Sequence, residues 1–453
     1  MRKRLLAVPI AFALLCLVGV APSAQQSPHK KPITHDVYDS WKTIQGTKIS
    51  RDGTWVAYAL VPQDGDGELV VRNLKTNAEY RAPRGRDPII TPDGKFVVFA
   101  KAPVKADVDK ARKAKRRPDD MPKSGVGIVD LTSGQVTTIA EHVKSFRLPE
   151  EPVRFVAYVT APEPAEGARR PQPSDEERPA SRLKKHDPGT DLIVRDLASG
   201  AQTTVAEVAE YAVAKDGSAI AYSVSSKTPA NEGAFIRRIA DGSTKALTTG
   251  AGDYKGFAFD GKISQVAFIS NRDEFTNVAS RAAPRFKLYH ATMNATSASE
   301  LNVPAETRAG PIAVSENGRL EFSKDGARLF FGTAAPPTPE PDDTSDMIKV
   351  DIWNYKDAEL QPMQKVHAED EKKRNFRAVI HLADKRFVQL ASPDMPDVRT
   401  GDSAERALGV SDVPYRQLIS WDGSYDDVYL VKLSDGSRQK ILGKARFQPS
   451  MSP

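Results

Sequence analysis

A tight turn and a short apolar strand stand together in the sequence TPDGKFVVFAK, residues 91–101. Asp93 and Gly94 supply the turn, because glycine has no Cβ to clash at positive φ and aspartate can hydrogen-bond its own backbone. The apolar run FVVFA that follows is typical of a strand with at least one buried face. The same combination recurs, at intervals of roughly 40 to 70 residues, in residues 50–60, 148–160, 214–225, 259–270, 323–333 and 382–392.

Each of these stretches is followed by a third strand, a second turn and a fourth strand. The sequence assigns this place to residues 68–82, 127–140, 191–206, 234–248, 287–301 and 427–442, and less regularly to residues 349–363. Four strands running up and down form one blade of a β-propeller, and recurrence at this interval indicates several blades. We therefore predict an all-β fold, a propeller of four-stranded antiparallel blades, over residues 36–453.

Residues 448–453, QPSMSP, resemble the beginning of one more turn. The sequence therefore predicts seven blades and leaves open an eighth that is cut off within its turn. On this interpretation the propeller is incomplete at its C-terminal end. The composition suits a β-rich protein with many turns, since the 453 residues include 33 prolines and 29 glycines.

The first 24 residues form a separate segment. Arg2, Lys3 and Arg4 precede an apolar run at residues 5–20, and small residues follow at 21–24. This order is that of a secretory signal peptide, so we expect cleavage after Ala24 and a periplasmic or secreted protein. An uncleaved membrane anchor is the alternative, but the apolar run is short for a membrane span.

The single cysteine, Cys16, would be removed with the signal peptide. The mature chain would then have no disulfide bond, no thiol nucleophile and no cysteine metal ligand. The residues before Cys16, Ala13 to Leu15, lack the small side chains expected before a lipidated cysteine.

The formal net charge is +6, and loss of the signal peptide would lower it to about +3. Positive residues are concentrated in residues 101–118, which include Lys110, Arg112, Lys113, Lys115, Arg116 and Arg117. No aromatic residue stands between these charges for base stacking, so we expect no nucleic-acid partner. A solvated insertion is the simplest interpretation, and a patch for an anionic polymer or a membrane surface is the functional alternative.

Four polar segments interrupt the strand pattern: residues 101–124, 161–188, 334–345 and 393–415. Each falls between the second and third strands expected for its unit. In blades whose strands run up and down, these connections emerge on one face of the propeller, opposite the Asp-Gly turns. Loops on one face are frequent binding sites, although segments this poor in aromatic residues are also typical of plain surface loops.

Candidate catalytic groups are few. The nearest approach to the Gly-x-Ser-x-Gly nucleophile elbow of serine hydrolases is GDSAE, residues 401–405, which lacks the final glycine and a preceding buried strand around Ser403. The seven histidines show no metal-ligand spacing, and DGDGE, residues 64–68, lacks the ligand positions of a calcium loop. We therefore assign no catalytic, cofactor-binding or metal-binding residue, and we expect no cofactor.

Several strings resemble a known family. They are YDSWK at residues 38–42, ISRDG at 49–53, DDMPKSG at 119–125 and DIWNYKD at 351–357. Together with the repeated turns, they resemble the N-terminal propeller of secreted bacterial prolyl oligopeptidase-family serine peptidases. The resemblance covers the chain from about residue 36 to its end. Periplasmic TolB-like propellers and other WD-like propellers use the same turn.

This resemblance implies an enzyme in two parts, in which a propeller limits access of peptides to an α/β-hydrolase domain that carries the Ser, Asp and His triad. The positions of that triad have no counterpart in this chain, so no catalytic residue is transferred to it. We expect a non-catalytic, substrate-gating propeller whose partners are a peptide or protein substrate and the missing hydrolase domain. The alternative is a standalone periplasmic propeller that binds a protein or peptide. Neither hypothesis includes a membrane partner after signal cleavage.

Overall fold

The computed structural model describes residues 35–152, 154–162, 188–276, 282–308, 310–338, 350–447 and 449–451. These residues are mostly β-strand, and the sheets are antiparallel. The expected signal peptide, residues 1–24 with its cleavage site after Ala24, lies outside the described residues, as do residues 163–187 of the expected insertion 161–188. None of the described helices is long and apolar enough to cross a membrane.

Apart from one two-stranded pair, the described strands fall into seven consecutive four-stranded groups, which we call units 1 to 7, and two long strands are each shared by neighbouring groups. Unit 1 contains β1 (Lys42–Ile49), β2 (Trp55–Pro62), β3 (Glu68–Asn73) and β4 (Glu79–Pro83). Unit 2 contains β5 (Gly85–Ile90), β6 (Phe96–Lys101), β7 (Ser124–Asp130) and the first part of β8 (Val136–Arg147). Unit 3 contains the second part of β8, β9 (Phe155–Thr160), β10 (Thr190–Asp196) and the first part of β11 (Gln202–Val213). Unit 4 contains the second part of β11, β12 (Ala219–Val224), β13 (Gly233–Arg238) and β14 (Thr244–Thr249).

The remaining strands form units 5 to 7. Unit 5 contains β15 (Tyr254–Phe259), β16 (Gln265–Ser270), β17 (Lys287–Thr292) and β18 (Ser299–Leu301). A two-stranded pair follows, β19 (Glu306–Thr307) with β20 (Gly310–Pro311). Unit 6 contains β21 (Ala313–Val314) and β22 (Glu321–Phe322), which together form its first strand, then β23 (Arg328–Ala334), β24 (Phe376–His381) and β25 (Arg386–Gln389). Unit 7 contains β26 (Asp397–Arg399), β27 (Arg406–Ser411), β28 (Asp426–Lys432) and β29 (Arg438–Ala445).

Two long strands connect units 2, 3 and 4 into one ten-stranded sheet. The first part of β8 pairs with β7, while its second part, from Val143 onward, pairs with β9. The strand β11 makes the same transition, because its first part pairs with β10 and its second part with β12. Each long strand therefore ends one unit and begins the next. His142 and Glu207 have positive φ at these transitions, where the register shifts.

Short helices lie at the N-terminal end and in the connections between strands. They are η1 (His35–Ser40), α2 (Lys105–Lys113), η2 (Pro118–Asp120), η4 (Pro229–Asn231), α3 (Arg272–Phe275), α4 (Gln361–Lys372) and η5 (Val413–Leu418). The helices α2 and η2 lie within residues 101–124, between β6 and β7. The helix α4 lies between β23 and β24, in a long connection of which residues 339–349 are outside the described part.

The Asp-Gly turns at Asp52, Asp93 and Asp325 join the first and second strands of units 1, 2 and 6, and one hydrogen-bond pattern recurs in them. In unit 2 the Thr91 hydroxyl donates to the Asp93 carboxylate at 2.6 Å, and this carboxylate accepts the backbone N–H of Lys95 at 3.1 Å. Gly94 completes the turn at a φ of 66°, which costs glycine little. Corresponding bonds link Ser50 with Asp52 in unit 1 and Ser323 with Asp325 in unit 6. In each of these turns, the aspartate carboxylate thus accepts hydrogen bonds from a Ser or Thr hydroxyl and from a backbone N–H of the same turn.

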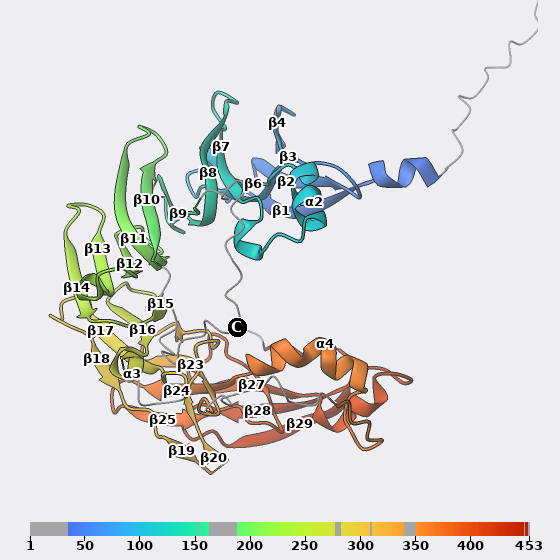
Figure 1. Ribbon diagram of the computed structural model, residues 1–453, viewed down its shortest axis with the longest axis vertical. Coiled ribbons are helices and arrows are strands. Elements are labelled where there is room, and N and C mark those ends of the chain that lie inside the picture. Colours follow the sequence, from blue (N-terminus) through green and yellow to red (C-terminus); the bar gives the residue numbers. More distant parts are fainter. Residues whose placement is uncertain are drawn as a thin grey trace, which may run out of the picture.

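The hydrophobic cores lie between neighbouring units. Leu69 of unit 1 packs with Phe99 of unit 2, and Phe268 of unit 5 contributes to the core that unit 5 shares with unit 4. Similar clusters fill the other interfaces between successive units. In Figure 1 the units follow one another round an arc, and among the described residues no core cluster joins unit 7 to unit 1.

Three sequence assignments in the last part of the chain were wrong. Residues 382–392 contain β25, the fourth strand of unit 6, because the Asp384 turn joins β24 to β25. Residues 350–363 form no strand, and the third strand of unit 6 is β24 instead. The expected insertion at 393–415 contains β26 and β27, the first two strands of unit 7. Unit 7 lacks the Asp-Gly signal at its first turn, which displaced the assignment by half a unit.

Candidate functional site

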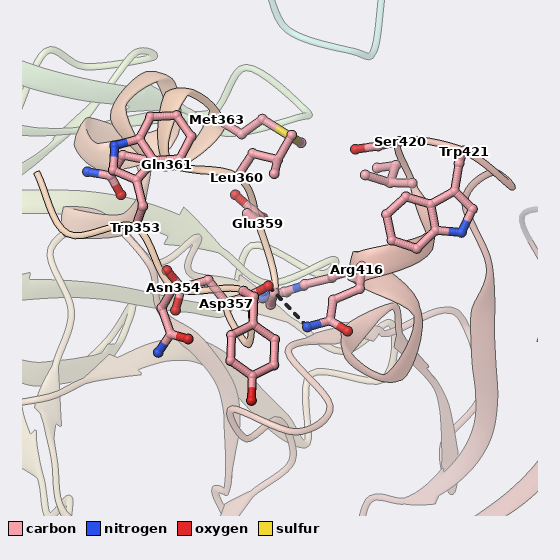
Figure 2. Close-up of a pocket in the computed structure, with 14 residues that line it drawn as sticks. Trp353, Asn354, Asp357, Glu359, Leu360, Gln361, Met363, Arg416, Ser420 and Trp421 are labelled. Carbon is pink, nitrogen blue, oxygen red and sulfur yellow. Dashed lines mark hydrogen bonds between the residues drawn. The ribbon is translucent and has the colours of Figure 1, made fainter.

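A cavity with exposed aromatic side chains lies where units 6 and 7 meet. Its volume is about 150 Å³. Two connections form its walls, residues 353–363 before and at the start of α4 and residues 416–421 at η5. Both connections join the second strand of a unit to its third. Figure 2 shows Trp353 and Trp421 on opposite sides of the cavity, with Leu360 and Met363 between them. We call this cavity and its walls the aromatic site.

Hydrogen bonds within the unit 6 connection fix the first wall. The Asn354 side chain accepts the backbone N–H of Lys356 at 3.0 Å, which closes a turn. The Gln364 amide of α4 donates to the carbonyl of Glu359 at 2.8 Å. Pro362 stands in the first turn of α4, where its missing N–H has no cost. The irregular segment before α4 therefore ends, and the helix begins, at the edge of the cavity.

The second wall is anchored to the sheet of unit 7 through Tyr415. Its hydroxyl donates to the Asp427 carboxylate at 2.7 Å, and Lys440 donates to the same carboxylate at 2.6 Å. Burial alone would raise the pKa of Asp427, but the hydrogen bonds from Lys440, Tyr415 and the backbone N–H of Lys444 hold this pKa below its ordinary value. The bond to Asp427 in turn raises the pKa of Tyr415. Asp427 is thus an ionised anchor under η5.

One side chain links the two walls. The Gln417 amide donates to the carbonyls of Lys356 and Asp357, both at 3.2 Å. The dashed line in Figure 2 marks the bond to Asp357. Arg416, next to Gln417, is held by two hydrogen bonds of 3.0 Å to Asp412. The two walls of the cavity, which belong to units 6 and 7, are therefore connected by hydrogen bonds of one side chain.

The aromatic site is unusually open to solvent for its composition. Trp353 is 66% exposed, Tyr355 88% and Trp421 73%. Ile352, Leu360 and Val366 nearby are also exposed. Exposed apolar groups in a patch mark interaction surfaces, and Trp, Tyr and Arg are the side chains that most often dominate binding energy. The arrangement can bind apolar groups with a polar rim of Asp357, Glu359 and Arg416.

The serine and histidine side chains that were weighed as catalytic or metal-binding candidates in the sequence form hydrogen bonds within the fold. The Ser403 hydroxyl accepts the backbone N–H groups of Glu405 and Arg406 at 3.3 and 3.2 Å, so it caps the turn before β27. His290 bonds Gln265 at 2.8 Å, and His381 bonds the carbonyl of Leu433 at 3.0 Å.

The DGDGE stretch at residues 64–68 holds the first turn of α2. Asp64 forms an ion pair of 2.5 Å with Lys105, and Asp66 accepts the backbone N–H of Lys105 at 2.9 Å. Within the described residues, no group of three or more His, Cys, Asp or Glu side chains could hold a metal ion.

Sequence reasoning missed the aromatic site. The signal was present in DIWNYKD, but the spacing of its apolar residues was interpreted as a strand. A second signal was the aromatic residue Trp421, close to Leu418 and Ile419 in a connection between strands. Only the pairing of β23 with β24 shows that residues 350–375 leave the sheet.

Comparisons with known proteins give a similarity in fold. No family model matches the chain, and no curated protein matches its sequence. The β-propeller domain of the Trilobed protease from Pyrococcus furiosus is 14% identical, with coverage of 90% of this chain and 100% of that chain and a TM-score of 0.37. A structure described in a study of two prolyl endopeptidases is 12% identical, with coverage of 91% and 51% and a TM-score of 0.41.

An acylaminoacyl peptidase from Pyrococcus horikoshii is 12% identical over 89% of this chain and 52% of its own, with a TM-score of 0.36. The chain therefore spans about half of the length of the two peptidases that it matches. The described sheets are antiparallel, and the structures to which the chain is similar include propeller domains of peptidases, at low identity.

Proposed function

We propose that this chain is the substrate-gating β-propeller of a serine peptidase of the prolyl oligopeptidase type, with units 1 to 7 as its seven blades. Catalysis then belongs to an α/β-hydrolase domain that acts as a partner of the propeller. The observation that supports this proposal is the aromatic site, which two neighbouring blades build from their second-to-third strand connections. A peptide or protein substrate contacts this site on its way to the hydrolase domain.

The size and polarity of the aromatic site favour a peptide. Sites for whole small molecules usually measure about 300–1,000 Å³, and this cavity measures about 150 Å³. It therefore suits one or two apolar side chains of a longer chain. Asp357, Glu359 and Arg416 at the rim present both donors and acceptors that the backbone of an extended peptide can use.

Secretion is part of this proposal. The N-terminal sequence supports a signal peptide with cleavage after Ala24 and a periplasmic or secreted location. Mass spectrometry of the protein purified from its own cells tests it, because a mature N-terminus at Gln25 is expected and an intact N-terminus would contradict it.

Peptide binding at the aromatic site can be measured by tryptophan fluorescence. The chain has four tryptophans, of which Trp353 and Trp421 line the cavity. An unfolded, proline-containing neutral peptide is expected to shift the emission of the parent protein and to bind Trp421→Ala at least about tenfold more weakly. Trp41→Ala is the matched control, since Trp41 is 51% exposed but lies outside the site. Equal affinity of the parent and Trp421→Ala would contradict the proposal.

A standalone propeller that binds a protein or peptide would use the same aromatic site. The coding DNA downstream of codon 453 separates the two functions. A continuing frame with a Gly-x-Ser-x-Gly segment between a strand and a helix supports the peptidase. A stop codon with no hydrolase frame following supports the standalone binding protein.

A further inference from the structure

A dense group of positive side chains lies in the last turn of α2 and in the four residues that follow it. Lys110, Arg112, Lys113, Lys115, Arg116 and Arg117 are all exposed. Their side chains form no hydrogen bond or ion pair with another described residue, whereas cations elsewhere, such as Lys42, Lys101 and Lys287, are paired with carboxylates. We call these six residues the α2 basic segment. Six like charges within eight residues repel one another, so an anionic partner would relieve a real cost.

The backbone that carries these charges is held in place. Lys105 at the start of α2 forms ion pairs of 2.5 Å with both Asp64 and Asp109. Ala111 is buried, and its carbonyl accepts the N–H of Arg116 at 3.0 Å. The cations are thus presented from a fixed support.

The neighbouring side chains favour a peptide over the other polyanions. Ala111 is buried and Val104 and Val108 are partly buried, so α2 offers no exposed apolar face to insert into a membrane. No aromatic residue lies in the segment to stack on bases. Arginine forks bind carboxylates in pairs of hydrogen bonds, and flexible lysines accept varied spacing along an extended chain.

We propose that the α2 basic segment binds acidic stretches of peptide, rich in Asp and Glu, and so selects such peptides as substrates. This inference rests on the proposed function, because it names the class of peptide that the propeller admits. Figure 1 places α2 on the inner side of the arc, as it does α4 beside the aromatic site. An acidic stretch of the peptide would contact α2, while an apolar residue of the peptide enters the aromatic site.

The test compares two fluorescein-labelled peptides of equal length by fluorescence anisotropy with the full chain. One peptide has four glutamates flanking a Pro-Leu pair, and the other has glutamines in their place. The acidic peptide is expected to bind more tightly than the neutral one, and its affinity is expected to fall steeply as salt is raised from 50 to 200 mM. Lys115→Gln/Arg116→Gln/Arg117→Gln is expected to bind the acidic peptide at least about tenfold more weakly.

The matched control is Lys75→Gln/Lys215→Gln/Lys262→Gln. These three lysines are exposed and have no side-chain partner among the described residues, but they lie apart in turns of units 1, 4 and 5. The control removes the same net charge, so an affinity for the acidic peptide within about twofold of the parent is expected.

Equal binding of the acidic and glutamine peptides, or an equal loss in both triple variants, would overturn the proposal. Binding to vesicles of anionic phospholipid without binding to the acidic peptide would also overturn it and would identify a membrane surface as the partner. The neutral peptide distinguishes the two levels of inference. If it still binds in a Trp421-dependent way while the charge variants have no effect, the proposed function stands and this inference fails.

Discussion

A single glycine shows how tightly the side chains pack within a unit. In β7, Gly127 faces the Phe99 ring of β6, and a Cβ on Gly127 would lie 2.3 Å from the nearest ring carbon. Phe99 is among the largest fully buried side chains and belongs to the core between units 1 and 2. Glycine is required there because the ring occupies the space of a side chain.

Gly127→Ala is expected to lower the free energy of unfolding by about 1–3 kcal/mol, because the added methyl group overpacks the core. Denaturation in urea measures the change. Gly401→Ala is the control, since no atom lies within 4 Å of a Cβ built there, and it should stay within about 0.5 kcal/mol of the parent. A parent-like stability of Gly127→Ala would mean that Phe99 can move aside.

The turn aspartates make stability depend on pH. A hydrogen bond from Ser50, with others at Thr54, lowers the pKa of Asp52 to about 2, and Ser323 lowers the pKa of Asp325. Since the unfolded carboxyls titrate near 3.9, the unfolded chain binds more protons as the pH falls through this range. The stability these turns contribute is present above that pH and is lost as the pH falls toward the folded pKa.

We therefore expect the thermal midpoint to fall between pH 5 and pH 3. Asp325→Asn should reduce that fall by roughly 1–2 °C, because the amide does not titrate. Asp107→Asn, an exposed residue of α2, should leave the fall unchanged. Calorimetry at the two pH values checks both, and an identical pH response of Asp325→Asn and the parent would refute the assignment to the turns.

At the scale of elements, the aromatic site depends on η5 and the unit 6 connection being held together. Gln417 makes the direct link, while Tyr415 and Asp427 fix η5 to β28. None of these bonds lies in a strand ladder. The walls of the aromatic site are therefore held by the hydrogen bonds of a few side chains and not by the pairing of strands.

Gln417→Ala is expected to loosen both walls without unfolding the protein. Removing a hydrogen bond of about 1 kcal/mol should speed backbone amide exchange in residues 412–425 roughly fivefold. Hydrogen exchange with mass spectrometry measures it, and exchange in β6 and β16 should be unchanged. Gln439→Ala, on the exposed strand β29, is the control. Parent-like exchange in residues 412–425 would show that other contacts hold η5.

At the scale of the whole molecule, successive units share cores, but the two ends of the arc have free apolar groups. Ile44 and Ile49 of β1 are 64% and 63% exposed, and Leu442 of β29 is 42% exposed. The cluster of Leu408, Val410, Val428 and Ala445 belongs to unit 7 alone. The hydrophobic cores between neighbouring units therefore provide most of the buried apolar surface, and units 1 and 7 each share such a core with one neighbour only.

We predict that residues 25–453 have no peptidase activity of their own, because the sequence has no Gly-x-Ser-x-Gly elbow and its nearest approach, GDSAE, lacks the final glycine. A fluorophosphonate probe should label the purified chain at background level, and peptide esters should not be hydrolysed. Ser403→Ala should change neither result, because Ser403 caps a turn. Stoichiometric labelling of any serine would overturn this prediction.

The sequence by itself determined the features that depend on neighbours along the chain. The turn of Thr91, Asp93 and Gly94 and the apolar strand β6 use bonds within a few residues, so their pattern was readable six times. The first turn of unit 7 was not predicted, because its sequence, GDSAE, lacks the Asp-Gly pair.

Tertiary structure alone decided which apolar segments leave the sheets. The string DIWNYKD has the spacing of a strand, but β24 takes the place beside β23 and leaves Trp353 and Tyr355 exposed. The bond from Gln417 to Asp357 joins residues 60 positions apart. Such a contact depends on how two units pack, and no local pattern encodes it, which is why the aromatic site appeared only in the folded chain.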